Sequence, residues 1–125
     1  MGIRVRAHHT SFAIKDLARS KAFYGGVLGL TEIARPNFGF PGAWYQAGTC
    51  QVHLIEIPEG FDAGQAPPAL NPMADHAAFG IDDYGETAAH LKANGLEVLE
   101  GGAEVGQMWV KDPDGHIIEL IVDSR

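Results

Sequence analysis

The octapeptide HTSFAIKD at residues 9–16 returns later in the chain as HAAFGIDD at residues 76–83, with His, Phe, Ile and Asp at matching positions. The offset from His9 to His76 is 67 residues. A second match, at an offset of 66 residues, links VHLI at 52–55 with IELI at 118–121. Because an internal repeat constrains architecture more than local propensity does, the chain is expected to contain two copies of one module.

The two halves also show the same order of hydrophobic patterns. An alternating stretch, residues 4–14 and then 75–81, predicts a strand, and apolar residues at helical spacing over 17–28 and 84–93 predict the helix that follows. The expected N-caps are Asp16 and either Asp82 or Asp83, and the expected C-terminal glycines are Gly29 and Gly95. Three shorter strands complete each half, at about 30–35, 43–48 and 50–57 and at about 96–100, 106–111 and 116–122.

This order predicts an α+β fold of paired βαβββ modules, whose matching apolar faces pack with the helices outside. Module one is expected at 3–57 and module two at 74–123. Residues 58–73, rich in Gly, Pro and Ala, are the expected linker. With 125 residues the chain suits a single domain over 1–125.

Charge and composition exclude several classes of function. The formal charge is −7 and the nine Lys and Arg residues are scattered, so nucleic acid is not an expected partner. No apolar stretch suits a signal peptide or reaches the length of a bilayer crossing, so a soluble protein without membrane association is expected. Cys50 is the single cysteine, which precludes an internal disulfide and favours the cytoplasm.

Strand alternation separates the polar residues from the core. In the first strand Phe12 and Ile14 share one face, and His9 and Ser11 share the other, with the same arrangement repeated after His76. Small residues beside each His leave space that a strand buried only for packing would not need. The two histidines are therefore expected to face a site.

A buried carboxylate is predicted in the last strand. Glu119 lies among Ile117, Ile118 and Leu120, and an ionised carboxylate there is costly unless a cation compensates it. Its equivalent in the repeat is His53. The sequence thus predicts one mononuclear metal site with the four ligands His9, His53, His76 and Glu119.

Three imidazoles and one carboxylate suit a divalent transition metal ion, namely Zn, Ni, Co, Mn or Fe, among which the ligand types do not discriminate. The alternative interpretation is that these histidines are hydrogen-bonded core residues and that Glu119 is an edge-strand carboxylate.

These residues resemble the vicinal oxygen chelate superfamily, which includes glyoxalase I, extradiol dioxygenases, fosfomycin-resistance enzymes, methylmalonyl-CoA epimerase and bleomycin-binding proteins. The resemblance covers nearly the whole chain. It rests on His9 with Asp16-Leu17, on SKAFY at 20–24 followed by VLGL at 27–30, on HAAF at 76–79, and on DPDG at 112–115 leading to Glu119.

The resemblance implies a homodimer that acts on a small molecule, with the metal held by His9, His76 and Glu119. His53 falls where glyoxalase I has a glutamate that both binds metal and moves a proton. The leading hypothesis is a metal-dependent, glyoxalase-like enzyme that chelates neighbouring oxygens of its substrate for lyase or isomerase chemistry. Glu119 and His53 are the candidate catalytic proton carriers.

Two other functions stay open. One is a ring-cleaving dioxygenase that uses Fe(II), which needs two His, one carboxylate and open positions on the metal. The other is a non-catalytic protein that binds a small molecule such as an antibiotic.

A pocket for a partly apolar substrate is a further expectation, with simple core packing as the alternative. Arg35 could pair with a substrate carboxylate or be a solvated surface residue. His8 has the opposite strand parity from His9 and is expected to face away from the site. The candidate walls are Phe38, Phe40, Trp44, Tyr45, Met108 and Trp109.

Overall fold

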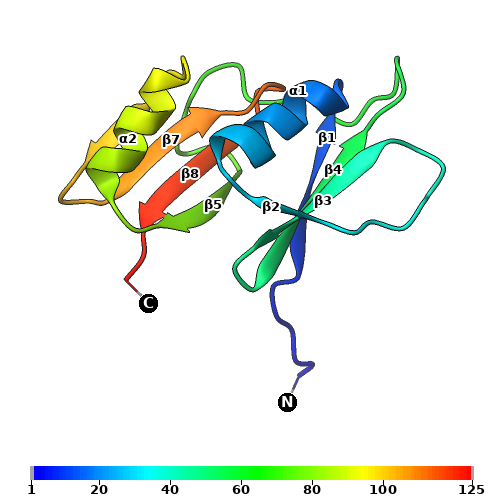
Figure 1. Ribbon diagram of the computed structural model, residues 1–125, viewed down its shortest axis with the longest axis horizontal. Coiled ribbons are helices and arrows are strands. Elements are labelled where there is room, and N and C mark those ends of the chain that lie inside the picture. Colours follow the sequence, from blue (N-terminus) through cyan, green and yellow to red (C-terminus); the bar gives the residue numbers. More distant parts are fainter. Residues whose placement is uncertain (1, 125) are drawn as a thin grey trace. The chain divides into compact units, whose positions relative to one another are not determined.

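The computed structural model describes residues 2–124. Met1 and Arg125, the ends of the predicted domain, lie outside the described residues. The chain divides into two compact units, Met1–Ala63 and Gly64–Arg125. Each contains one four-stranded sheet with a helical segment against it (Figure 1).

The first unit has the strand order β1-β4-β3-β2, in which β1 and β4 are parallel and the other neighbours antiparallel. Its elements are β1 (His9–Ile14), α1 (Leu17–Lys21), η1 (Ala22–Val27), β2 (Thr31–Ile33), β3 (Gly42–Ala47) and β4 (Cys50–Glu56).

The second unit repeats this topology with the order β5-β8-β7-β6 and with β5 parallel to β8. The predicted α+β fold of paired βαβββ modules is confirmed. The elements are β5 (His76–Ile81), α2 (Tyr84–Ala93), β6 (Leu99–Gly102), β7 (Gln107–Lys111) and β8 (Ile117–Val122).

The strand register shows that the repeat in sequence is also a repeat in structure. Ser11 lies opposite His53 in the first unit, and Ala78 lies opposite Glu119 in the second. On the other side of the same strands, a tryptophan lies opposite each of these residues, since Trp44 pairs with His53 and Trp109 with Glu119. Equivalent positions of the two modules therefore lie on the sheet face away from the helical segment.

The helix N-caps are those expected. The side chain of Asp16 accepts a hydrogen bond from the amide of Arg19, and Asp83, rather than Asp82, accepts one from Glu86. At the C-termini, Gly29 follows the first helical segment and Gly95 the second, both with positive φ.

The first helical segment differs from the continuous helix predicted over 17–28. A single α-helical turn, α1, passes into the π-helix η1, which contains the consecutive glycines Gly25 and Gly26. Glycine has low helix propensity, and a Cβ on Gly25 would lie 3.3 Å from Cε1 of Tyr45. The π-helical turn, which is wider than an α-helical turn, thus lies where the segment packs closely against β3.

The first strand is shorter than predicted. It begins at His9 rather than at residue 4, because its partner β4 begins at Cys50 and pairs Gln51 with His9. Residues 2–8 therefore have no strand beside them and are exposed. In the second unit, β6 spans Leu99–Gly102 rather than 96–100, and a register irregularity lies between Glu100 and Gly102.

The face of each sheet that carries the helical segment forms a core. Phe12, Ile14 and Tyr24 are buried in the first unit, with the Phe12 and Tyr24 rings 5.5 Å apart. Tyr45 and Met108 are also fully buried, which corrects their assignment as pocket walls. Their aromatic or apolar character suggested the pocket, but strand parity puts both side chains on the core face of their sheets.

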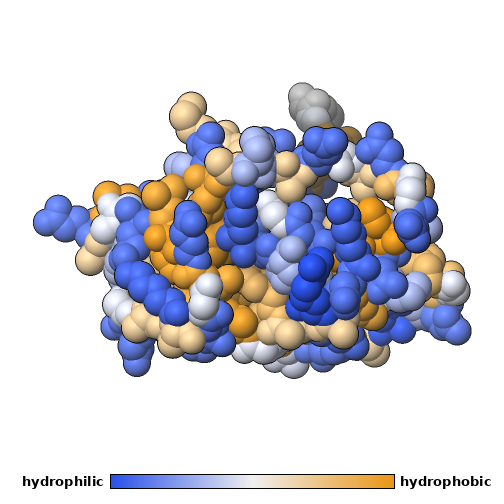
Figure 2. Space-filling view, turned by 90° about the horizontal axis from the view of Figure 1, so that it is seen from above, coloured by the Kyte–Doolittle hydropathy of each residue, from blue (hydrophilic) through white to orange (hydrophobic). Residues whose placement is uncertain are grey.

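Hydrophilic residues cover much of the surface visible in Figure 2, with apolar areas between them. Within residues 2–124, none of the helices has the length and hydropathy that a bilayer crossing requires.

Candidate metal and substrate site

The predicted sorting of side chains by strand parity is present in β1 and β5. In β1, Phe12 and Ile14 are buried on the helical side, while His9 and Ser11 are exposed. In β5, His76 is likewise exposed. The sheet face away from the helix is therefore the polar face in both units.

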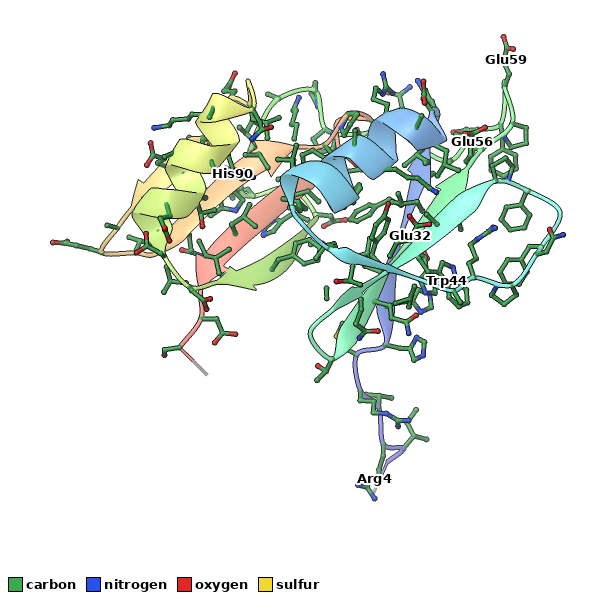
Figure 3. The ribbon with its side chains drawn as sticks, in the orientation of Figure 1. Arg4, Glu32, Trp44, Glu56, Glu59 and His90 are labelled. Atoms are coloured by element: carbon green, nitrogen blue, oxygen red, sulfur yellow. The ribbon has the colours of Figure 1, made fainter. Side chains whose placement is uncertain are left out.

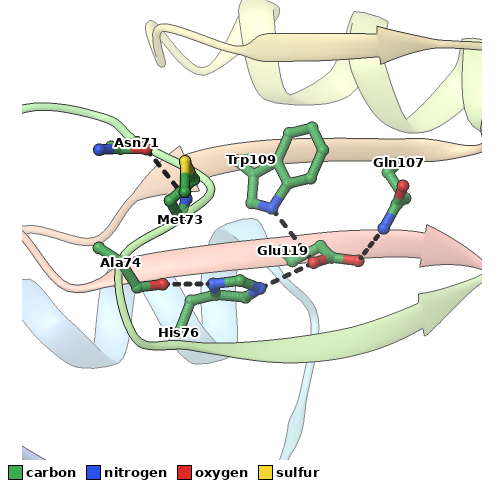
Figure 4. Close-up of polar contacts among 7 residues, drawn as sticks. All are labelled: Asn71, Met73, Ala74, His76, Gln107, Trp109 and Glu119. Carbon is green, nitrogen blue, oxygen red and sulfur yellow. Dashed lines mark hydrogen bonds and ion pairs between the residues drawn. The ribbon is translucent and has the colours of Figure 1, made fainter.

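Glu119 and His76 form the central contact of the second unit. Nε2 of His76 lies 2.8 Å from Oε1 of Glu119, which is 6% exposed (Figure 4). The indole N–H of Trp109 donates to Oε1 at 3.1 Å, and the amide of Gln107 donates to Oε2 at 3.0 Å. Glu119 is thus held in one orientation by three neighbours.

The tautomer of His76 follows from its other nitrogen. Nδ1 lies 2.7 Å from the carbonyl oxygen of Ala74, which only accepts hydrogen bonds, so Nδ1 carries the proton. In the neutral ring Nε2 then has a lone pair directed at the Glu119 carboxylate. Two acceptors at 2.8 Å require a cation between or beside them, either a proton or a metal ion.

The distance between these two atoms also fits metal binding. Two ligand atoms at about 2.1 Å from one ion lie about 3 Å apart at the right angle of octahedral coordination and about 3.4 Å apart at the tetrahedral angle. Nε2 of His76 and Oε1 of Glu119 are at 2.8 Å, and the carbonyl of Ala74 orients the imidazole as an outer-shell partner does in metal proteins. The donor chemistry of this pair therefore fits a divalent transition metal.

The first unit brings the other two candidate ligands together by ring stacking. The ring centroids of His9 and His53 are 4.0 Å apart, and the ring of Trp44 stacks on the other face of His53 at 4.1 Å with an interplanar angle of 6°. His53 is 7% exposed. Its imidazole is thus fixed between two rings on the polar face of the sheet.

Two further contacts define the imidazoles of this unit. The side-chain oxygen of Gln51 lies 2.9 Å from Nε2 of His53, which makes Nε2 the hydrogen-bond donor. Nδ1 of His8 lies 2.8 Å from Nδ1 of His9, so His8 contacts the site. His8 was expected to face away, but it precedes β1, where strand parity does not apply.

Burial lowers the pKa of His53 below its ordinary value, and positive charge at His9, His8 and Arg35 lowers it further. The neutral, metal-binding form of His53 is therefore favoured.

A cavity of about 230 Å³ opens beside His9 and His53 in the first unit. Three of the predicted walls, Phe38, Phe40 and Trp44, line it, and so does Arg35. Ser11 and Ile55 complete the lining. Trp109, the remaining predicted wall, instead lies in the second unit and binds Glu119.

The structure thus pairs His9 with His53 and His76 with Glu119, each pair within one unit. Over residues 2–124 it shows no group of three or more His, Cys, Asp or Glu side chains that could hold a metal ion. The four-ligand site stays a prediction.

Gln51 and Gln107 were missed by sequence reasoning. Strand parity could have found Gln51, since it shares a strand face with His53 two residues on. Gln107 has the same relationship to Trp109 on β7.

Comparison with known proteins identifies the class. The model of the glyoxalase/bleomycin resistance protein/dioxygenase superfamily matches residues 6–120. The chain belongs to this superfamily.

Individual relatives in the superfamily include lyases and transferases. The chain is 33% identical to glyoxylase I 4 of Arabidopsis thaliana, over 90% of this chain and 68% of that protein. It is 30% identical to the lactoylglutathione lyase of Salmonella typhimurium, over 94% and 92%. It is 31% identical to the glutathione transferase FosA of Serratia marcescens, over 94% and 80%.

Among solved structures, a glyoxalase/dioxygenase from Nostoc punctiforme is 26% identical with a TM-score of 0.75, covering 96% of this chain and 92% of that one. A mutant fosfomycin resistance protein FosX from Listeria monocytogenes has a TM-score of 0.73 at 19% identity, over 98% and 95%, and shares the fold. That structure is a complex with Mn(II) and dihydroxypropylphosphonic acid.

Proposed function

We propose that the chain is a metal-dependent, glyoxalase-like enzyme that binds a small substrate through two neighbouring oxygens and carries out lyase or isomerase chemistry. The observation that carries the proposal is the contact between His76 and Glu119. Its geometry suits a metal ion as well as a shared proton, because Nε2 of His76 and the carboxylate oxygen are both acceptors at 2.8 Å. Relatives at about 30% identity named as lyase and transferase support an enzymatic role.

The proposed ligands are His9, His53, His76 and Glu119. Since each unit supplies two of them, one complete site requires a pair of each kind, either from one chain or from two copies in a homodimer. The metal is proposed to be one divalent ion among Zn, Ni, Co, Mn and Fe. The complex of FosX with Mn(II) supports a divalent ion within this fold.

A bound divalent cation would supply a Lewis acid that lowers the cost of negative charge on the chelated substrate oxygens. The protein side chains then have distinct tasks. Trp109 and Gln107 hold the Glu119 carboxylate in place, and the stack of Trp44, His53 and His9 fixes the imidazoles.

Proton transfer is assigned to His53 or Glu119. Both are nearly excluded from solvent, and each is anchored at a defined atom, His53 through Nε2 on Gln51 and Glu119 through both oxygens. An anchored base maintains the reach that proton abstraction needs. The lowered pKa of His53 keeps its ring neutral, so that Nδ1 can either bind the metal or accept a proton.

The experiment measures exchange of a substrate C–H for deuterium. Small α-hydroxycarbonyl compounds are incubated in D₂O with chelator-treated protein and then with each added divalent metal, and exchange is followed by NMR. We expect exchange that depends on metal and is lost in Glu119→Gln. Metal-independent exchange, or none with any metal over the compound panel, would contradict the proposal.

One observation favours a second function. His53 donates to Gln51 through Nε2, which leaves Nδ1 as its one acceptor; if Nδ1 takes the substrate proton rather than the metal, the metal donors are His9, His76 and Glu119. Two His and one carboxylate form the ligand set of Fe(II) oxygenases. Oxygen consumption with catechols in the Fe(II)-loaded protein would support ring cleavage, and its absence would leave the lyase or isomerase assignment.

A further inference from the structure

A cation lies in the wall of the cavity that His9 and His53 line, and the metal chemistry does not use it. Arg35 belongs to the segment between β2 and β3 and is partly buried there. Its guanidinium shares the cavity of about 230 Å³ with the rings of Phe38, Phe40 and Trp44. The cavity thus combines one positive charge with flat apolar walls.

Arg35 is held in position by three kinds of contact. Nη2 donates to the carbonyl of Phe40 at 3.1 Å, and the guanidinium carbon lies 5.0 Å from the ring centroids of both Phe38 and Phe40. The guanidinium also lies directly against Gly42, where a Cβ would be 2.8 Å from Nη2. These contacts fix the guanidinium before any ligand arrives.

No acidic side chain among residues 2–124 forms an ion pair with Arg35, although the chain has 16 Asp and Glu residues against nine Lys and Arg. A guanidinium carries five N–H donors, and the Phe40 carbonyl accepts one hydrogen bond from Arg35. A partly buried cation with donors to spare and no carboxylate of its own chain is suited to an external anion.

We propose that Arg35 binds the carboxylate of a small, flat organic acid whose body packs against Phe38, Phe40 and Trp44. A carboxylate matches the planar fork of a guanidinium in a bidentate contact. The volume is below the roughly 300–1,000 Å³ of pockets for drug-sized ligands, so the ligand is small. Because His9 and His53 line the same cavity, this acid would be the substrate of the enzyme. That further step rests on the proposed function.

The test measures binding of benzoate by calorimetry to chelator-treated protein and then to metal-loaded protein. Benzamide, a neutral molecule of the same shape, is the ligand control. The variants are Arg35→Gln, Arg35→Lys, which keeps the charge but loses the fork, and Arg4→Gln, which makes the same change in an exposed arginine remote from Trp44 (Figure 3).

We expect benzoate to bind without metal, and Arg35→Gln to weaken it about 10-fold to 100-fold, as for loss of a charge-assisted hydrogen bond. Benzamide should bind wild-type protein at least about tenfold more weakly than benzoate, a comparison that needs no variant to fold. Arg35→Lys should restore part of the affinity, and Arg4→Gln should match wild type.

Absence of benzoate binding, equal binding of benzamide, or an unaffected Arg35→Gln would overturn the proposal. Tighter binding of phenylphosphonate than of benzoate would overturn the choice of carboxylate. The metal-free measurement separates this inference from the proposed function. Benzoate binding in a protein that takes up no metal would leave the Arg35 site standing while the metal chemistry fails.

Discussion

Nε2 of His76 lies 2.8 Å from Oε1 of Glu119, whereas their counterparts in the repeat, His9 and His53, stack ring on ring at 4.0 Å. The same two strand positions therefore hold an acceptor pair in one unit and a stacked imidazole pair in the other. The tryptophans opposite them differ in the same way, since Trp109 donates its N–H to Glu119 while Trp44 stacks on His53. Duplication preserved the positions, and substitution gave them different chemistry.

Glu119→Gln should reduce metal affinity by at least about 100-fold and abolish turnover, because it removes the one anionic ligand while keeping the side-chain size. Metal content after dialysis, measured by mass spectrometry, checks this. Glu104→Gln, the same change at an exposed position, should retain the metal. A Glu119→Gln protein with full metal content and full activity would remove Glu119 from the site.

Trp109→Phe changes no proposed ligand, but it deletes the donor that holds Oε1 of Glu119. It should therefore weaken metal binding about 10-fold to 100-fold. Trp44→Phe is the matched control, since a phenyl ring still stacks on His53 and no hydrogen bond is lost. Metal titration of both variants gives the comparison. Equal affinities would show that the indole N–H does not position Glu119.

In metal-free protein the ring of His53 should titrate below its ordinary pKa, since burial and then the positive charge of its neighbours disfavour protonation. The unfolded chain then binds the proton more readily, so the free energy of unfolding falls as pH drops from about 6.5 toward the lowered pKa. NMR titration of the ring C–H signals, assigned with His53→Gln, measures it. A pKa at or above the ordinary value would contradict the stacked, buried environment.

Gly42→Ala should destabilise the protein by about 2–3 kcal/mol, as overpacking does. A Cβ there would overlap the backbone oxygen of Leu54 and would lie 2.8 Å from Nη2 of Arg35. Gly26→Ala, where a Cβ meets nothing within 4 Å, should leave stability unchanged or raise it. Urea unfolding compares the two, and equal midpoints would contradict the close packing of Leu54 and Arg35 around Gly42.

The repeat made the fold predictable, because two matched segments such as 9–16 and 76–83 fix the order of elements in both modules. The apolar neighbours of Glu119 correctly predicted its burial, and parity correctly placed His9 on the polar face. Parity did not identify the first residue of β1. A strand extends only as far as its hydrogen-bonded partner does, and the partner β4 is distant in sequence.

The chemistry of the site was less predictable than its positions. That His53 stacks between two rings and donates to Gln51 depends on side-chain rotamers, which residue type and spacing do not encode. The same holds for the tautomer of His76, which a backbone carbonyl outside the motif determines.

Anomalous diffraction from crystals grown with a divalent transition metal would locate the ion that the proposed function requires. We expect one peak per site at about 2.0–2.2 Å from Nε2 of His76 and a carboxylate oxygen of Glu119, with imidazole nitrogens of His9 and His53 completing the coordination in one chain or across two. A protein that binds no metal, or a peak away from His76 and Glu119, would contradict it.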